Sequence, residues 1–218
     1  MENVKKSSKT IQIIKKLCIA FLGGLVLTFG YLYFDANANT PTKLEANQSM
    51  PVFSTTDVRG NTISDASLKG KKTIMVFERF VGCPVCNVHV HELMQEYANL
   101  KSKGVELVVI YESSKENLMK FATTEEIPFT LIADPNGEIY STFGVTKSMG
   151  KVMKGIMFKG GISLAKEGDK NYKGKYKKDG SMSRMTAEFL VWTDGVITKA
   201  HYAKYLGDHI SMDEIKNF

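Results

Sequence analysis

Hydrophobic and polar residues are distributed differently in three successive parts of the chain. Residues 17–34 form one uncharged apolar stretch, which predicts a helix that is apolar on every face. Residues 39–49 are mostly polar and predict a tether. From residue 50 to residue 218, short runs rich in β-branched residues alternate with segments of helical periodicity, a pattern typical of an α/β layered domain. We therefore expect an N-terminal segment of residues 1–38, a short tether and one domain.

The centre of the predicted domain is a strand followed directly by two cysteines and a helix. Residues 72–80 contain a run of apolar residues and predict a largely buried strand. After Cys86, apolar residues recur at the spacing of one helix face as far as Gly104, which predicts a helix that ends there. The cysteines therefore lie at the junction of a strand and a helix.

Later segments predict further strands and helices of the same layered kind. The β-branched run 105–111 predicts a strand, and Ser113 with Glu116 three residues later predicts a helix that begins with a capping box. A parallel crossover is expected from this alternation. The remaining predicted elements are a strand over 129–133, a short helix over 138–143, a hairpin of 189–193 and 196–202, and a last helix from Ser211.

The connection 146–184 has no pattern of a strong strand or a long helix. It contains eleven Lys or Arg residues against three acidic ones, together with several glycines, and forms a basic insertion in the predicted domain. A connection of this length is usually a functional flap or a disordered insert. Met149, Met153 and Met157 lie at helical spacing and predict a short helix whose methionines pack on the sheet, with a lid or a membrane-surface role as the alternative.

The segment 1–38 is predicted to direct the protein to the membrane. Five lysines precede its apolar stretch, and Ala36, Asn37 and Ala38 give the small-x-small pattern of a signal-peptidase site. As a helix, the apolar stretch would span roughly 27 Å, close to the thickness of the hydrocarbon core, so that an uncleaved anchor is equally expected. In both cases the lysines stay inside, and residues from 39 onward are predicted to be extracytoplasmic: periplasmic, secreted, or anchored to the membrane and facing outside.

Composition and charge exclude several classes of protein and of partner. The 218 residues are 43 % hydrophobic and 24 % charged, which excludes collagen-like, disordered and multi-span membrane classes. The net charge is +6, but half of it comes from the N-terminal segment, and the remaining +3 gives no indication of a nucleic-acid partner. Three cysteines are too few for a disulfide scaffold, and we predict no role for Cys18 in the apolar stretch.

Cys83, Pro84, Val85 and Cys86 form a CxxC motif at the predicted start of a helix. Two thiols at this spacing can close a small-loop disulfide, and the free N–H groups and positive dipole end of the helix stabilise the first cysteine as a thiolate. Pro84 suits the first helical turn, where no N–H is needed. Cys83 is therefore expected to be the attacking thiol and Cys86 the resolving thiol.

Haem attachment, zinc binding and a structural disulfide are the other uses of such a cysteine pair. Haem attachment is excluded because Asn87, not His, follows Cys86. A zinc site would need two further ligands, and His89 and His91 on the same helix make a poor tetrahedral cage, so that no metal is expected. A structural disulfide remains the alternative, although a CxxC between a buried strand and a helix is a frequent redox arrangement.

Several segments have the order found in a known family. They are residues 50–53, Asp57 with Gly60, the CPVC motif, VVIYESSKENL, IPFTLIADPNGEIYSTFGV and AEFLVWTDGVITKAHY. From about residue 50 to its C-terminus the chain thereby resembles the peroxiredoxin-like branch of the alkyl hydroperoxide reductase and thiol-specific antioxidant (AhpC/TSA) family. The resemblance implies an α/β, thioredoxin-like fold, a central mixed β-sheet flanked by helices, with a peroxiredoxin-type N-terminal extension.

The chain departs from the family pattern near the cysteines. Typical peroxiredoxins carry a proline and then a Thr or Ser at fixed spacings before the reactive cysteine, and neither Cys83 nor Cys86 is preceded by them. Thioredoxins have a cis-proline before the strand that ends in the hairpin, and Thr186 is the residue expected at that place here. This substitution resembles peroxiredoxins more than thioredoxins.

Peroxiredoxins also place a guanidinium beside the cysteine. The resemblance offers Arg184 for this position, with membership of the basic insertion as the other interpretation of that residue. Arg79, four residues before Cys83, is the rival candidate. Glu78 is a candidate proton acceptor near the buried thiol, or else the partner of a lysine.

The sequence therefore predicts an exported thiol oxidoreductase with a redox-active disulfide Cys83–Cys86 and no other cofactor. The first hypothesis is a peroxidase that reduces hydroperoxides and is reset by an external thiol or dithiol reductant. The second is an oxidoreductase that acts on protein disulfides through a mixed disulfide. A third is a non-catalytic binding module with a structural disulfide, in which the basic insertion is the working surface. If the N-terminal segment is uncleaved, it supplies a membrane contact.

Overall fold

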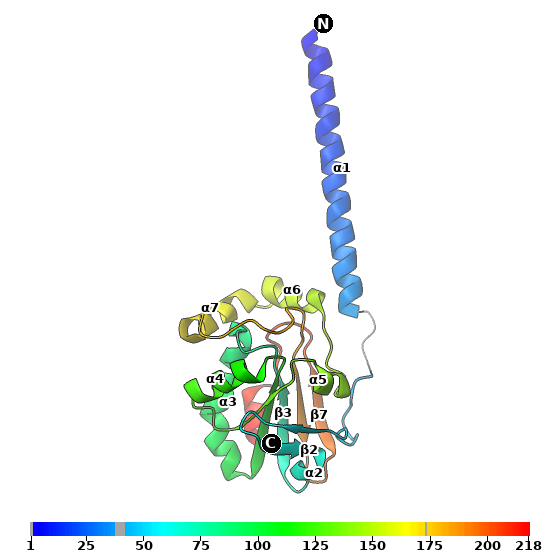
Figure 1. Ribbon diagram of the computed structural model, residues 1–218. Coiled ribbons are helices and arrows are strands. Elements are labelled where there is room, and N and C mark those ends of the chain that lie inside the picture. The colour runs from blue at the N-terminus through cyan, green and yellow to red at the C-terminus, as the bar shows by residue number, and fades with distance from the viewer. Residues whose placement is uncertain (1, 38–41, 173) are drawn as a thin grey trace. The chain divides into compact units, whose positions relative to one another are not determined.

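The computed structural model describes residues 2–37, 42–172 and 174–218. The chain divides into two compact units, residues 1–38 and 39–218. The first unit is one helix, α1 (Glu2–Asn37), and the second is an α/β domain (Figure 1). Ala38, with the predicted cleavage site, and residues 39–41 of the predicted tether lie outside the described residues.

Helix α1 contains an apolar window, Gln12–Tyr31, with a mean hydropathy of 1.8. By length and composition this window is long enough to cross a membrane. Its side chains are exposed in the structure, apolar ones such as Phe21, Val26 and Leu27 included. The structure thus contains the helix that the sequence predicted over the apolar stretch 17–34.

The domain is built on a five-stranded mixed sheet in the order β5-β4-β3-β6-β7. The central strand β3 runs parallel to β4 and antiparallel to β6, so that Phe77 pairs with both Ile110 and Ala187. The parallel crossover and the hairpin predicted from the sequence are confirmed. The strands are β3 (Lys72–Phe77), β4 (Val105–Tyr111), β5 (Thr130–Ala133), β6 (Ala187–Val191) and β7 (Ile197–Tyr202), and a separate hairpin consists of β1 (Ser54–Thr56) and β2 (Thr62–Ser64).

Helices cover both faces of the main sheet because side chains alternate along each strand. Ile74 and Val76 of β3 pack with residues of α3, α4 and α8 on one face. Met75 and Phe77 point to the opposite face, where α2 and α5 contribute to a second core. The helices of the domain are α2 (Asp65–Leu68), α3 (Pro84–Ser102), α4 (Lys115–Thr124), α5 (Glu138–Thr142), α6 (Met149–Phe158), α7 (Gly161–Tyr172) and α8 (Met212–Asn217).

The basic insertion contains two helices, α6 and α7, where the sequence predicted only a short one. They lie across one end of the sheet in Figure 1. Helix α7 approaches α3 so closely that a Cβ on Gly168 would lie 2.0 Å from the carbonyl oxygen of Pro84. Val152 and Gly155 are the buried residues of α6, whereas Met157 is 53 % exposed. The predicted packing of the methionines on the sheet is therefore wrong for Met157.

Several details differ from the predictions. Strand β3 ends at Phe77 rather than at residue 80, and a buried charged pair, Glu78 and Arg79, follows it. Ser114, not Ser113, caps α4, because the Ser113 hydroxyl donates to Asp179 and accepts from a backbone N–H. The described part of the tether, 42–49, is fixed to β7 by backbone hydrogen bonds.

Candidate active site

The two cysteines of the CxxC motif lie where the sequence placed them. Cys83 is the N-cap residue of α3, Pro84 is its first helical residue and Cys86 follows in the first turn. Both cysteines are free thiols and each is only 1 % exposed. They pack in a small apolar cluster with side chains that include Val152 of α6 and Met185, so that the insertion helps to bury them.

The two thiols have opposite ionisation properties. Burial disfavours the Cys83 thiolate, but the hydrogen bond from Cys86 and the charge of Arg79 outweigh it, and the pKa of Cys83 falls to about 7. Burial raises the pKa of Cys86 well above its usual value, and the hydrogen bond to Cys83 raises it further. These pKa shifts favour the thiolate form at Cys83 and the protonated thiol at Cys86.

Arg79 is the guanidinium beside the cysteines. Its Nη1 lies 3.6 Å from the Cys83 Sγ, and its Nη2 donates to the carbonyl oxygen of Met182. The guanidinium also lies 5.1 Å from the centre of the Phe80 ring. Because Arg79 is only 3 % exposed, its charge acts on the thiol with little screening by water.

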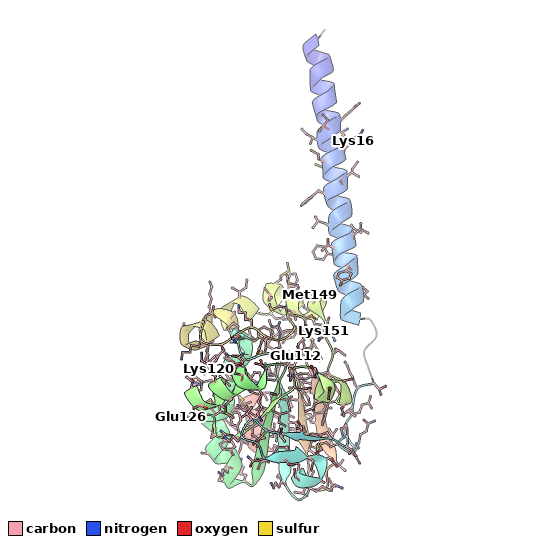
Figure 2. All side chains as sticks on the ribbon, viewed as in Figure 1. Lys16, Glu112, Lys120, Glu126, Met149 and Lys151 are labelled. Atoms are coloured by element: carbon pink, nitrogen blue, oxygen red, sulfur yellow. The ribbon has the colours of Figure 1, made fainter. Side chains whose placement is uncertain are left out.

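The structure gives Arg184 a different place from the expected one. Its Nη2 donates to Glu112 Oε1 at 2.8 Å and its Nη1 to the Val145 carbonyl at 3.0 Å. Glu112 also accepts from the Ser181 N–H and pairs with Lys147, and it lies at the end of the sheet nearest α6 (Figure 2). Arg184 thus links the end of the insertion to Glu112. The prediction that its guanidinium lies beside the cysteine is wrong, and Arg79 occupies that position instead.

Thr186 lies directly before β6, one residue from the Phe77–Ala187 pair, as expected. It is 3 % exposed, and its hydroxyl has no hydrogen-bond partner among the described residues. Its carbonyl accepts a hydrogen bond from Ala203, and no described peptide bond is cis. The backbone before β6 therefore lacks the cis-proline that thioredoxins have at this place.

Glu78 is fully buried and bonds to a histidine rather than to a lysine. Its Oε1 lies 2.8 Å from His89 Nδ1. Its negative charge adds to the rise in the pKa of Cys86, whereas at Cys83 the hydrogen bond from Cys86 and the charge of Arg79 outweigh it and the pKa still falls. The zinc alternative does not assemble on this helix, because His91 turns away to Gln95 and Tyr172 while His89 faces Glu78.

Glu188 of β6 and His209, after β7, complete a cluster that the sequence did not predict. His89 Nε2 lies 3.2 Å from Glu188 Oε1, and His209 Nδ1 lies 3.8 Å from Glu188 Oε2. Burial disfavours His89 protonation, but the two carboxylates outweigh it and raise its pKa to about 10. The pKa of Glu188 falls to about 2 despite its burial, because of His89, whereas burial and His89 lower that of His209 to about 4. A recurring spacing could not have revealed these contacts, since the residues lie on three distant segments.

Metal binding by this cluster is opposed by its geometry. Ligand atoms of Glu78, His89 and His209 lie within 4.8 Å of one another. The two imidazole rings, however, are stacked with their centres 3.8 Å apart and their planes at 18°. A metal ion binds a histidine nitrogen in the plane of its ring, and two stacked rings cannot both point at one ion. One ring would have to rotate first.

A cavity of about 310 Å³ opens beside the cysteines. Most of its wall is apolar and comes from the CxxC turn and from the insertion helices, with Lys166 and Lys178 among the charged residues. Cys83, Phe80 and Ile162 are part of the lining. The arrangement can admit a small or partly apolar molecule to the Cys83 thiol.

The family assignment rests on the part of the chain that holds this site. The model of the AhpC/TSA family matches residues 46–200, well over half of the chain. The chain belongs to the AhpC/TSA family. Peroxiredoxin Bcp of Escherichia coli (strain K12) is 32 % identical over 116 residues, which are 52 % of this chain and 74 % of that protein. This AhpC/TSA protein is therefore an oxidoreductase of the thiol peroxidase or thiol-disulfide oxidoreductase type, as the sequence predicted.

Solved structures confirm the thioredoxin-like fold of this AhpC/TSA protein. A thiol peroxidase from Chromobacterium violaceum matches with a TM-score of 0.56 at 13 % identity, over 81 % of this chain and 86 % of its own. A protein assigned as the thiol:disulfide interchange protein DsbE from Chlorobium tepidum matches with a TM-score of 0.50 at 17 % identity, over 73 % and 86 %. At these identities the likeness concerns the fold alone.

Proposed function

We propose that this AhpC/TSA protein is a thiol peroxidase that reduces hydroperoxides with Cys83 as the nucleophile. The observation that carries the proposal is the contact between the Arg79 guanidinium and the buried Cys83 sulfur at 3.6 Å. A hydroperoxide needs a thiolate to attack it and a donor for the departing oxygen, and this pair supplies both.

The reaction has three balanced steps. The Cys83 thiolate attacks the hydroperoxide, the O–O bond breaks, and with one proton the products are a Cys83 sulfenic acid and an alcohol, or water for hydrogen peroxide. The Cys86 thiol then displaces the sulfenic oxygen as water and forms the Cys83–Cys86 disulfide. An external dithiol returns two electrons and two protons and leaves oxidised. The cysteine pair carries both electrons, so the proposed cycle needs no cofactor.

A thiol-disulfide oxidoreductase acting on protein disulfides is the second candidate. The CxxC motif and the apolar walls of the cavity favour it, because both suit a cysteine-containing peptide segment. The burial of Cys83 favours the peroxidase, since a thiol that is 1 % exposed is easier to reach for a small hydroperoxide than for a protein disulfide.

Stoichiometric oxidation of the reduced full-length protein distinguishes the peroxidase from the thiol-disulfide oxidoreductase. The peroxidase proposal predicts that hydrogen peroxide or a short alkyl hydroperoxide converts Cys83 to a disulfide with Cys86 faster than insulin or another protein disulfide does. Peptide mass mapping separates Cys18 from the pair. Faster reaction with the protein disulfide would favour the second candidate, and a disulfide that resists reduction by dithiols would support a structural role.

We also propose that the domain lies outside the cytoplasmic membrane. The support is the apolar window Gln12–Tyr31 and the lysines that precede or begin it. N-terminal sequencing of the protein from cell fractions checks this. A chain that starts at Asn39 indicates export and cleavage, a full-length membrane protein indicates an anchor, and full-length protein in the cytosol contradicts both.

A further inference from the structure

We propose that the turn between α6 and α7 is a membrane-contact surface that rests in the headgroup region of an anionic lipid bilayer. This surface, called the insertion tip below, consists of three apolar residues and three lysines: Met157, Phe158 and Ile162 with Lys154, Lys159 and Lys166. The inference goes beyond the proposed thiol chemistry and rests on the proposed membrane location of α1.

Large apolar side chains are concentrated on the outside of the insertion tip. Phe158 is 68 % exposed, Ile162 is 56 % exposed and Met157 is 53 % exposed. The other exposed large apolar side chains of the described part of the domain lie at separate places in the sequence: Val52, Met182 and Trp192. A cluster of exposed apolar side chains on a folded domain marks a surface that contacts another protein or a membrane.

The packing of α6 holds the apolar side chains of the tip outward. A Cβ on Gly155 would lie 2.5 Å from the Leu206 backbone nitrogen, and Val152, one turn earlier, is also buried. The turn that follows is equally close to α6, since Gly160 has a φ of +74° and a Cβ on Gly161 would lie 2.9 Å from the Gly155 carbonyl oxygen. The exposure of the tip is therefore set by the packing of the backbone.

The insertion tip is also basic. Residues 147–166 include five lysines and no acidic residue. Lys154 precedes Phe158 by one helical turn and Lys166 follows Ile162 by one turn, so that exposed lysines lie on both sides of the apolar side chains. A lysine can lay its methylene groups on apolar surface while its ammonium group reaches a lipid phosphate. Exposed apolar residues flanked by lysines are typical of a surface that binds anionic lipid.

The chain enters the domain at the end of the sheet where the insertion lies. Leu44 donates its N–H to the Tyr202 hydroxyl, and Tyr202 pairs with Ala187 at the start of β6, directly after the insertion. In the sequence only residues 38–41 separate the end of α1 from Thr42. An α1 held in a membrane therefore keeps this end of the domain near the lipid, which raises the effective concentration of the tip at the membrane surface.

Anionic lipid fits the insertion tip better than a second copy of the chain does. A symmetric contact between two copies places the same surface of each against the other, and the lysines of both tips would then repel one another. Anionic headgroups instead compensate the charge of the lysines. Ile162 also lines the Cys83 cavity, so that contact between the tip and a membrane brings this cavity next to the lipid.

Fluorescence quenching by brominated lipid tests the insertion tip in the full-length protein. Trp192 is the single tryptophan of the chain, so that Phe158→Trp combined with Trp192→Phe gives a protein whose only tryptophan reports on the tip. This reporter protein and the wild type are reconstituted in vesicles of brominated phosphatidylcholine and phosphatidylglycerol. We expect quenching and a blue shift in the reporter protein. Trp192 of the wild type should stay unquenched, because it follows the end of β6 that pairs with Thr73, away from the insertion.

Two pairs of lysine substitutions in the reporter protein test the role of charge. Lys154→Gln with Lys159→Gln should lower the ratio of lipid-bound to free tip by about fivefold for each lysine removed. Lys69→Gln with Lys71→Gln removes the same charge from two exposed lysines just before β3, at the opposite end of the sheet, and should leave the quenching unchanged. Met157→Ser should weaken the quenching as well, because it removes apolar surface from the tip.

Three outcomes would overturn the proposal: reporter quenching no stronger than that of Trp192, quenching that the tip lysine substitutions leave unchanged, and a blue shift without quenching, which would mean that protein covers the tip. Flotation of the vesicles separates the tip from α1. Protein that floats without reporter quenching contradicts the tip alone, whereas protein that does not float contradicts both. The quenching does not depend on peroxide chemistry, so that failure of the peroxidase proposal leaves this test intact.

Discussion

The surroundings of Cys83 and of Cys86 differ although the two thiols share one helical turn. At Cys83 the charge of Arg79, which lowers the pKa, outweighs that of Glu78, whereas at Cys86 the charge of Glu78, which raises the pKa, outweighs that of Arg79. Arg79 and Glu78 are consecutive residues, and alternation at the end of β3 turns their side chains in different directions. One strand end thus places a cation beside Cys83 and supplies a carboxylate whose charge acts on Cys86.

The largest expected effects come from replacing either cysteine, because the two variants should differ in how much peroxide they consume and in the product that they form. Cys83→Ser should abolish peroxide consumption. Cys86→Ser should still consume one equivalent of peroxide but stop at the Cys83 sulfenic acid, because the resolving thiol is missing. Mass spectrometry of the protein after one equivalent of peroxide measures both. A Cys83→Ser protein that still reduces peroxide would assign the chemistry to Cys86.

Replacement of Arg79 removes the cation from the Cys83 side. Arg79→Met should slow the oxidation of Cys83 by roughly 30-fold to 1000-fold, since a charge-assisted donor in a buried site is lost. It should also raise the pKa of Cys83. The matched control is Arg184→Lys, because Arg184 is also a buried arginine but contacts Glu112 instead of the thiol. Equal rate losses in the two variants would show that Arg79 acts only through the fold.

Replacement of His89 tests whether the histidine that contacts Glu78 is charged, and the free energy of unfolding is the quantity measured. Because folding raises the pKa of His89 from 6.5 to about 10, its contribution is complete below pH 6.5 and disappears as the pH rises through 10. We expect His89→Gln to lower the free energy of unfolding by roughly 3 to 5 kcal/mol at pH 6, as for a broken buried ion pair. Urea unfolding from pH 6 to pH 10 should show the difference shrinking. A difference independent of pH would contradict a charged His89.

The sequence was most informative where structure depends on neighbouring residues. The run 105–111 formed β4 with the predicted ends, and the CxxC motif lies at the start of α3, because strand and helix patterns are local. The position of Arg79 four residues before Cys83 made it a candidate for the same reason. The resemblance to the AhpC/TSA family supplied the topology.

The remaining features depend on contacts between distant segments. Ser113 lost its predicted capping role because Asp179, sixty-six residues later, binds its hydroxyl. Arg184 lies with Glu112 because the insertion folds back on the end of β4. His89, Glu188 and His209 carry no common motif, and only the pairing of β3 with β6 and the return of the chain after β7 bring them together. None of these contacts has a signature in a single sequence.

The most direct test of the account is the pH dependence of alkylation of the two thiols in the reduced full-length protein. Iodoacetamide labelling, resolved by peptide mass spectrometry, gives a rate for Cys83 and for Cys86 at each pH. We predict that the rate for Cys83 rises through a midpoint near pH 7, while Cys86 shows no midpoint up to pH 9. A single shared midpoint, or faster labelling of Cys86 at pH 7, would contradict the assignment of the nucleophile.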